Sequence, residues 1–125
     1  GAPCPELDAY NETGIWIGDI PGLPDGHLRY PNLLELIDIP DRHAGTLVVK
    51  AAYRERVLAA KDTMLRRGRW KLVRQPLGDG EKYLLFDLET DPGCQHDVAA
   101  DHPAVRAELA AALAALMRAG AGCAT

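Results

Sequence analysis

The second half of the chain carries two different periodicities of apolar residues. Between Lys82 and Leu88 successive residues are expected to alternate between two faces, as in a β-strand. Both faces carry apolar side chains. A strand with two apolar faces is expected at the centre of a sheet, with other structure packed on each side. Phe86 in this strand and Trp70 before it are predicted to lie in the core.

Residues 101–120 follow the helical period instead. Pro103 suits the first turn of a helix that Asp101 or His102 caps, and Gly120 is a natural stop. Five apolar residues fall at i, i+4, i+7, i+8 and i+11 and form one stripe: Val105, Leu109, Ala112, Leu113 and Leu116. The stripe predicts an amphipathic helix that packs on one face of a sheet.

Turn signals divide the residues before the strand at 82–88 into further strands. We expect the chain to enter a strand within 57–66, to turn at Arg67–Gly68 and to return along 69–76, and Gly78-Asp79-Gly80 predicts the next turn. Strand, turn, strand, turn, strand is an antiparallel meander. The predicted fold class is therefore α+β, a small antiparallel β-sheet of three to four strands packed against a C-terminal amphipathic helix.

Proline and glycine break the first 45 residues into short pieces. Residues 8–16 are predicted to be extended, and residues 31–37 are predicted to form a short helix. After them, residues 46–49 form a short β-type run and residues 51–56 a helical turn. A segment as irregular as 1–45 is expected to wrap around a larger body rather than fold alone.

The chain has 125 residues, a usual size for one domain. We divide it into an irregular wrapping segment (1–45), the antiparallel meander (46–100) and the helix (101–120). A net charge of −4 favours neither a nucleic-acid partner nor a membrane surface, and no run reaches the roughly 18 to 20 apolar residues of a membrane span. The start at Gly1 without Met favours a chain cut from a longer one, whose compartment, cytoplasmic or periplasmic, stays open.

Two residue counts restrict the chemistry. The chain contains no serine, which excludes every mechanism with a serine nucleophile. Its three cysteines, Cys4, Cys94 and Cys123, form no C-x-x-C pair, and both one disulfide and three reduced thiols remain open. The run from Cys94 to Asp97 is too short for a structural zinc site and favours a turn after the last strand.

Two phrases in the second half resemble the tail of a known enzyme family. They are residues 64–73 (MLRRGRWKLV) and residues 83–93 (YLLFDLETDPG), the second followed by DVA at 97–99. In residue types, order and spacing they are similar to the C-terminal subdomain of bacterial, arylsulfatase-like sulfatases of the alkaline phosphatase superfamily. Residues 8–13 resemble a segment that precedes this tail in some members. Cys94 and His96-Asp97 depart from the family's usual Glu and Asn, at positions that are not catalytic there.

The resemblance implies a longer hydrolase that cleaves sulfate esters, or related phosphate esters or phosphonates. Its nucleophile would be a formylglycine made from Cys or Ser within C/S-x-P-x-R, next to a calcium-type divalent cation. No residue of this chain matches that motif or the family's metal ligands, so neither catalytic residues nor a cofactor site are assigned to it. The implied function is a non-catalytic C-terminal part that supports the N-terminal catalytic domain. The alternative is a stand-alone binding or adaptor domain without a hydrolase parent.

Four residues of the irregular segment are candidates for the rim of the parent's substrate pocket: Glu12, Trp16, His27 and Arg29. In the family this subdomain can lend loops to that rim. The competing interpretation is loop packing. Glu12 with His27 or His43 could also form an acid–base pair, if the fold brought them together.

Nine of the fourteen Lys and Arg residues fall between Lys50 and Arg74. With Trp70 nearby the run could bind single-stranded nucleic acid or an anionic sugar, but alternating charges around a hairpin favour a solvated face or a contact with an acidic surface of the parent's main domain. The expected partner is therefore the catalytic domain of the same polypeptide, without nucleic acid or membrane. An excised tail is also expected to dimerise through the docking face that it exposes.

Overall fold

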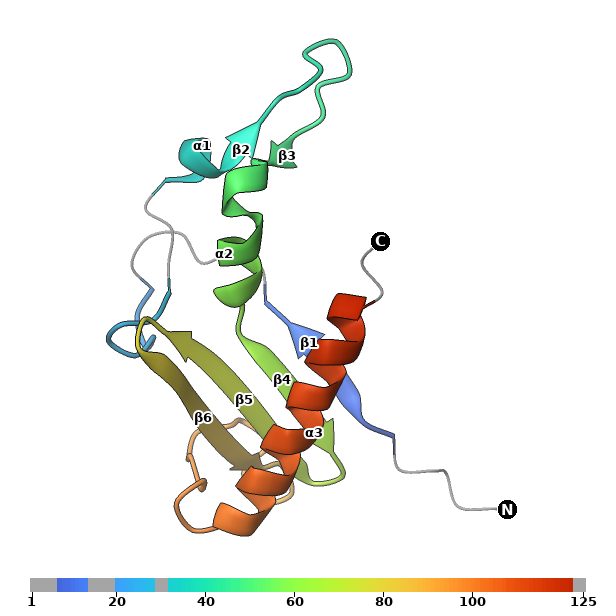
Figure 1. Ribbon diagram of the computed structural model, residues 1–125. Helices are drawn as coiled ribbons and strands as arrows, with labels where there is room; N and C mark the ends of the chain where they lie inside the picture. The colour runs from blue at the N-terminus through green and yellow to red at the C-terminus, as the bar shows by residue number, and fades with distance from the viewer. Residues whose placement is uncertain (1–6, 14–19, 29–31, 123–125) are drawn as a thin grey trace. The chain divides into compact units, whose positions relative to one another are not determined.

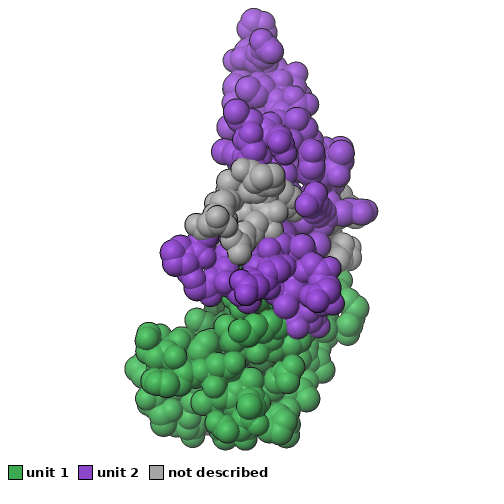
Figure 2. All heavy atoms as spheres, turned by 90° about the vertical axis from the view of Figure 1, so that its left-hand side faces the viewer, with its two compact units in different colours: residues 1–12, 62–75, 82–125 green, residues 13–61, 76–81 purple. Residues whose placement is uncertain are grey.

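The chain folds into two compact units, coloured separately in Figure 2. The computed structural model describes residues 7–13, 20–28 and 32–122. Unit 1 is made of residues 1–12, 62–75 and 82–125, and unit 2 of residues 13–61 and 76–81. No helix among the described residues is both long and apolar enough to cross a bilayer.

Unit 1 is built on a four-stranded antiparallel sheet with one helix on its face, which confirms the predicted α+β class (Figure 1). The strand order is β1-β4-β5-β6. The helix α3 (Pro103–Gly122) lies across the sheet. The strands are β1 (Ala9–Glu12), β4 (Thr63–Arg67), β5 (Trp70–Leu77) and β6 (Gly80–Asp87).

Two tight turns connect the last three strands. The first consists of Gly68 and Arg69, because Arg67 and Trp70 already pair across the strands, and it lies one residue later than predicted. Gly68 has a φ of +55°, a left-handed conformation that glycine adopts without steric cost. The second turn, Gly78–Asp79, is where the sequence places it, although its tip, residues 76–81, belongs to unit 2.

The core of unit 1 lies between the sheet and α3. Leu65 and Leu72 stand directly opposite each other on neighbouring strands and are both fully buried. They pack with Leu85 of β6 and with Leu109 and Leu113 of α3. Each buried leucine contributes about 1.5–3 kcal/mol of transfer free energy, so this cluster is the main source of stability in unit 1. Two further predicted core residues are placed at its margins: Trp70 packs against the cluster partly buried, and Phe86 is buried outside it.

The apolar stripe of α3 is confirmed for four of its five predicted residues. Leu116 is wrong: it is 37% exposed, and Met117 packs against the core in its place. At 3.6 residues per turn the buried line drifts around the helix, and near this end it passes from Leu113 to Met117. The helix also continues through Gly120, which was expected to stop it.

Two predictions about strands are corrected by the structure. The chain enters a strand within 57–66 as predicted, but only at Thr63, because α2 (Arg54–Ala59) occupies the first part. Val57 is buried on this helix and packs with Leu36 and Ala60. The strand predicted at the centre of the sheet, β6, lies at its edge, and β1 from the N-terminal segment makes β4 an inner strand.

Unit 2 is smaller and less buried. Its described elements follow one another as a helical turn α1 (Leu33–Leu36), a two-stranded antiparallel ribbon, a 3-10 turn η1 (Ala51–Tyr53) and α2. The ribbon pairs β2 (Ile37–Asp38) with β3 (Val48–Val49). Asn32 caps α1 by accepting a hydrogen bond from the Leu34 amide, as its side chain favours. The core of the unit consists of three residues: Leu36, Val57 and Ala60.

Candidate functional site

Two of the four predicted rim residues, Glu12 and His27, lie in the described part of the chain, and they belong to different units. Trp16 and Arg29 lie outside the described residues. Glu12 ends β1 in unit 1 and is exposed, opposite Thr63 of β4. Its carboxylate accepts a hydrogen bond of 3.1 Å from the Tyr10 hydroxyl. Burial and this bond raise the pKa of Tyr10, so its hydroxyl is a neutral donor.

His27 is a buried residue of unit 2, with 6% of its surface exposed. Its Nδ1 lies 2.8 Å from the Leu28 carbonyl oxygen, and its backbone forms an antiparallel bridge with Leu77. Next to it the Leu28 amide donates to the Pro76 carbonyl and the Gly78 amide to the Gly26 carbonyl. His27 therefore fastens the segment around it to the tip of the β5–β6 hairpin, a role that packing explains. His43 is exposed on the loop between β2 and β3.

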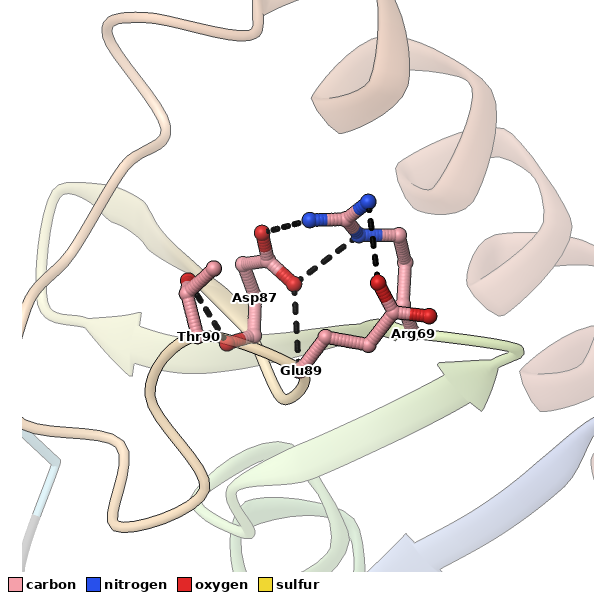
Figure 3. Close-up of polar contacts among 4 residues, drawn as sticks. All are labelled: Arg69, Asp87, Glu89 and Thr90. Atoms are coloured by element: carbon pink, nitrogen blue, oxygen red, sulfur yellow. Dashed lines mark hydrogen bonds and ion pairs between the residues drawn. The ribbon is translucent and has the colours of Figure 1, made fainter.

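The polar residues of the family-like phrases gather at one end of the sheet in unit 1. Figure 3 shows the guanidinium of Arg69, from the β4–β5 turn, facing the carboxylate of Asp87 at the end of β6. Nε of Arg69 donates to Oδ1 of Asp87 at 2.9 Å, and a second guanidinium nitrogen donates to Oδ2. Arg69 also pairs with Glu89 at 3.1 Å. We call Arg69, Asp87, Glu89 and Thr90 the Arg69 cluster.

The Arg69 cluster joins the two turns at this end of the sheet. The Glu89 amide donates to Asp87 Oδ1 at 3.2 Å, and the Leu88 amide donates to the Arg69 carbonyl at 2.7 Å. The guanidinium lies over the Trp70 ring, 5.3 Å from its centroid. Hydrogen bonds from Arg69, together with the Glu89 amide, lower the pKa of Asp87 from 3.8 to about 2. At neutral pH this carboxylate is ionised, so it is unsuited to donating a proton as a general acid.

A second arginine network ties three parts of unit 1 together. Arg67 at the end of β4 makes two hydrogen bonds to Asp8, at 2.8 and 2.7 Å, and one of 3.0 Å to Glu108 of α3. The bond from Arg67 lowers the pKa of Asp8. All three side chains are partly or largely exposed, so the network adds little to the free energy of unfolding. Its main effect is to hold the three parts of unit 1 in position. Sequence reasoning missed it because the partners are 59 and 41 residues away.

Aspartates also organise the loop between β6 and α3. Asp91 and Cys94 close a turn with a backbone bond of 3.1 Å, as the Asp-Pro-Gly sequence predicts. The backbone amides of Gln95 and His96 donate to Asp91 and lower its pKa. Asp97 accepts from the amides of Leu85 and Ala99, each at 3.0 Å. These carboxylates hold the backbone of the loop and do not point toward a common reacting atom.

Cys94 is the one cysteine in the described part of the chain. It has a φ of +52° and lies partly buried, with its sulfur 3.8 Å from the Lys71 ammonium. Among the described residues no group of three or more His, Cys, Asp or Glu side chains could hold a metal ion.

No protein-family model, curated protein or solved structure matches this chain. The arrangement of its own side chains is therefore the ground for a functional proposal. Arg67 and Arg69 of unit 1 are paired with carboxylates, and Asp91 and Asp97 accept hydrogen bonds from backbone amides. These contacts hold two turns and the loop between β6 and α3 in place.

Proposed function

We propose that this chain is the non-catalytic C-terminal part of a sulfatase-type hydrolase, which it supports by docking on the catalytic domain. The observation that carries the proposal is the Arg69 cluster. The first family-like phrase supplies Arg69 from the β4–β5 turn and the second supplies Asp87, Glu89 and Thr90 at and after the end of β6, and these side chains contact one another within the unit. A tail that only has to keep its shape is expected to use these residues in this way. The parent would hydrolyse sulfate esters, or related phosphate esters or phosphonates, with its own formylglycine and calcium-type cation.

The docking surface proposed for the catalytic domain is the face of the sheet opposite α3. Successive residues of a strand point to opposite faces, so Met64 and Val73, which stand opposite each other, lie on this second face. Leu84 follows the same alternation on β6, next to the buried Leu85. All three are partly buried and none belongs to the core cluster. A half-covered apolar row on a sheet is what a partner domain would cover.

The charges beside this row favour an acidic partner surface. Arg66 and Lys71 stand directly opposite each other on the same face, next to Met64 and Val73. Two like charges on opposed positions of a sheet repel each other, and an acidic partner would relieve that repulsion. The candidates for the rim of the parent's substrate pocket stay as the sequence gives them: Glu12, Trp16, His27 and Arg29.

A stand-alone adaptor domain is the second candidate. It is favoured by the number of apolar side chains that unit 2 exposes, among them Leu34 at 72% and Leu47 at 60%. An adaptor needs exposed apolar surface but no hydrolase parent. Both candidates predict no turnover by this chain alone.

Substituting Val73→Asp in the full-length native polypeptide tests the docking surface. We expect sulfate-ester turnover to fall at least about tenfold, because a charge on the apolar row is desolvated on docking, and such a charge typically costs more than 1.4 kcal/mol, a factor of ten. The matched control is Leu7→Asp, which puts the same charge at a side chain that is 76% exposed in unit 1. Circular dichroism of both variants of the isolated chain checks that the sheet still folds.

Equal activity of the two variants would contradict the docking surface. Loss of turnover in both variants would also contradict it, because the loss would then not depend on the second face of the sheet.

A further inference from the structure

The two edges of the four-stranded sheet in unit 1 are held in different ways. At the β6 edge, the Leu85 amide donates to Asp97 at 3.0 Å, and the Val98 amide donates to the Leu85 carbonyl at 2.8 Å. Leu85 itself is fully buried in the core, so the loop after β6 is fastened to this edge. The other edge is β1, which lies beside β4 (Figure 1). All four residues of β1 are exposed.

The strand β1 takes little part in the packing of unit 1. Among the described residues, the core cluster and the side chains packed against it come from 65–117, and none comes from 7–12. Two polar contacts of β1 lie within the strand. The Tyr10 hydroxyl donates to Glu12 at 3.1 Å, and the Glu12 amide donates to the Asn11 side chain at 2.8 Å. Such internal contacts persist when the strand leaves the sheet, so they do not hold it on β4.

An arginine joins the start of β1 to the rest of unit 1. Arg67 of β4 donates to Asp8, the residue before the strand, at 2.8 and 2.7 Å, and to Glu108 of α3 at 3.0 Å. After Glu12 the chain leaves unit 1, and it returns only at Asp62. Separation of β1 from β4 therefore breaks the backbone pairing and the contact with Asp8, while the core between β4, β5, β6 and α3 stays packed.

We infer that β1 is a detachable edge strand, which separates from β4 without unfolding unit 1 and which Arg67 holds closed. Opening of a part of a protein is least costly where few apolar contacts are buried and the backbone hydrogen bonds lie at the surface. The opening bares the backbone groups of β4 from Thr63 to Arg66, an edge with which another extended segment can pair. This device requires no hydrolase parent, so it is independent of the proposed docking on a catalytic domain.

Amide hydrogen exchange of the full chain, followed residue by residue by NMR, tests the inference. Relative to their intrinsic rates, the protected amides of β1 are expected to exchange at least about tenfold faster than those of Leu72 and Leu85. Low concentrations of urea separate the two kinds of opening, because the effect of urea grows with the surface that an opening exposes. Exchange at Leu72 and Leu85 should rise about tenfold per molar urea, and exchange in β1 should stay nearly constant.

Arg67→Gln tests the part assigned to the arginine. We expect exchange in β1 to rise about threefold, the usual effect of losing an exposed ion pair. The matched control is Arg66→Gln, the same substitution at the neighbouring residue of β4. Arg66 stands opposite Lys71 on the second face of the sheet, and this relation is the same whether β1 is closed or open. The control is therefore expected to leave exchange in β1 unchanged.

Three results would overturn the inference. The first is exchange in β1 that is as slow as at Leu72 and Leu85 and rises as steeply with urea, because β1 would then open only when the whole unit unfolds. The second is a β1 without protected amides in the unsubstituted chain, because the strand would then not be held closed. The third is an equal effect of Arg67→Gln and Arg66→Gln on exchange in β1.

Discussion

Leu113→Ala lowers the free energy of unfolding of this protein by about 2–5 kcal/mol, the cost of removing a leucine from a packed core. Leu113 is 1% exposed and packs from α3 against Leu65, Leu72 and Leu85. The lost side chain forfeits its transfer free energy and leaves a cavity that the three strands cannot fill without bending. The loss is measured by urea denaturation followed by circular dichroism at fixed pH, with the slope of the transition unchanged.

Leu116→Ala is the matched control on the same helix. Leu116 is 37% exposed, so its removal opens no closed cavity and is expected to cost less than half as much. A cost for Leu116→Ala equal to that for Leu113→Ala would show that α3 packs with a different face, along the stripe that the sequence alone predicts.

Asp87→Asn removes a part of the protein's stability that depends on pH. The pKa of Asp87 is about 2 in the folded protein, against an ordinary value of 3.8, because Arg69 holds the ionised form. A folded pKa below the unfolded one adds stability above the unfolded pKa, and this stability is lost as the pH falls through the folded pKa. The variant is therefore expected to be less stable than the unsubstituted chain at neutral pH. The difference should shrink between about pH 5 and pH 2.

The comparison between the two chains isolates Asp87 from other acids. Asp8 also has a lowered pKa, set by Arg67, and contributes equally to both chains, whereas the charge of Asp87 raises the pKa of Asp91, so this pKa falls further in the variant. Arg69→Gln should produce the same convergence, and the double variant should add little, because the two residues act as one pair. A stability difference that stays constant from pH 7 to pH 2 would show that the Arg69 cluster does not depend on the charge of Asp87.

Much of unit 1 could be predicted from the sequence because its elements are local. Turn residues placed both hairpin turns to within one residue, and the helical spacing from Val105 to Leu113 identified the buried stripe of α3. In each case the residues that decide the structure are a few positions apart. The antiparallel sheet and its covering helix follow from such local signals.

The position of β6 in the sheet could not be predicted in this way. Its two apolar faces, with Leu85 and Phe86 buried on opposite sides, report what lies above and below the strand. Neighbours within a sheet bond through the backbone and leave no trace in the side-chain pattern. The strand β1 (Ala9–Glu12) forms the opposite edge of the sheet, beside β4. Its place there depends on backbone pairing with residues more than fifty positions away.

The sequence identified the polar residues of the candidate site as parts of motifs, but it did not identify the contacts between them. The sequence places Arg69 and Asp87 in the two family-like phrases, but not against each other, since they are 18 residues apart. Burial of His27 was also missed, because nothing in its neighbourhood in the sequence indicates the bridge to Leu77. Long-range pairs of this kind require the fold before they can be recognised.

The intact mass and N-terminal sequence of the polypeptide made from the native gene test the proposed function most directly. The account predicts a product several times larger than the 13.5 kDa of this chain, which carries a formylglycine within a C/S-x-P-x-R motif upstream of residue 1. A native product of about 13.5 kDa would contradict the sulfatase parent, and would leave the adaptor function as the interpretation to pursue.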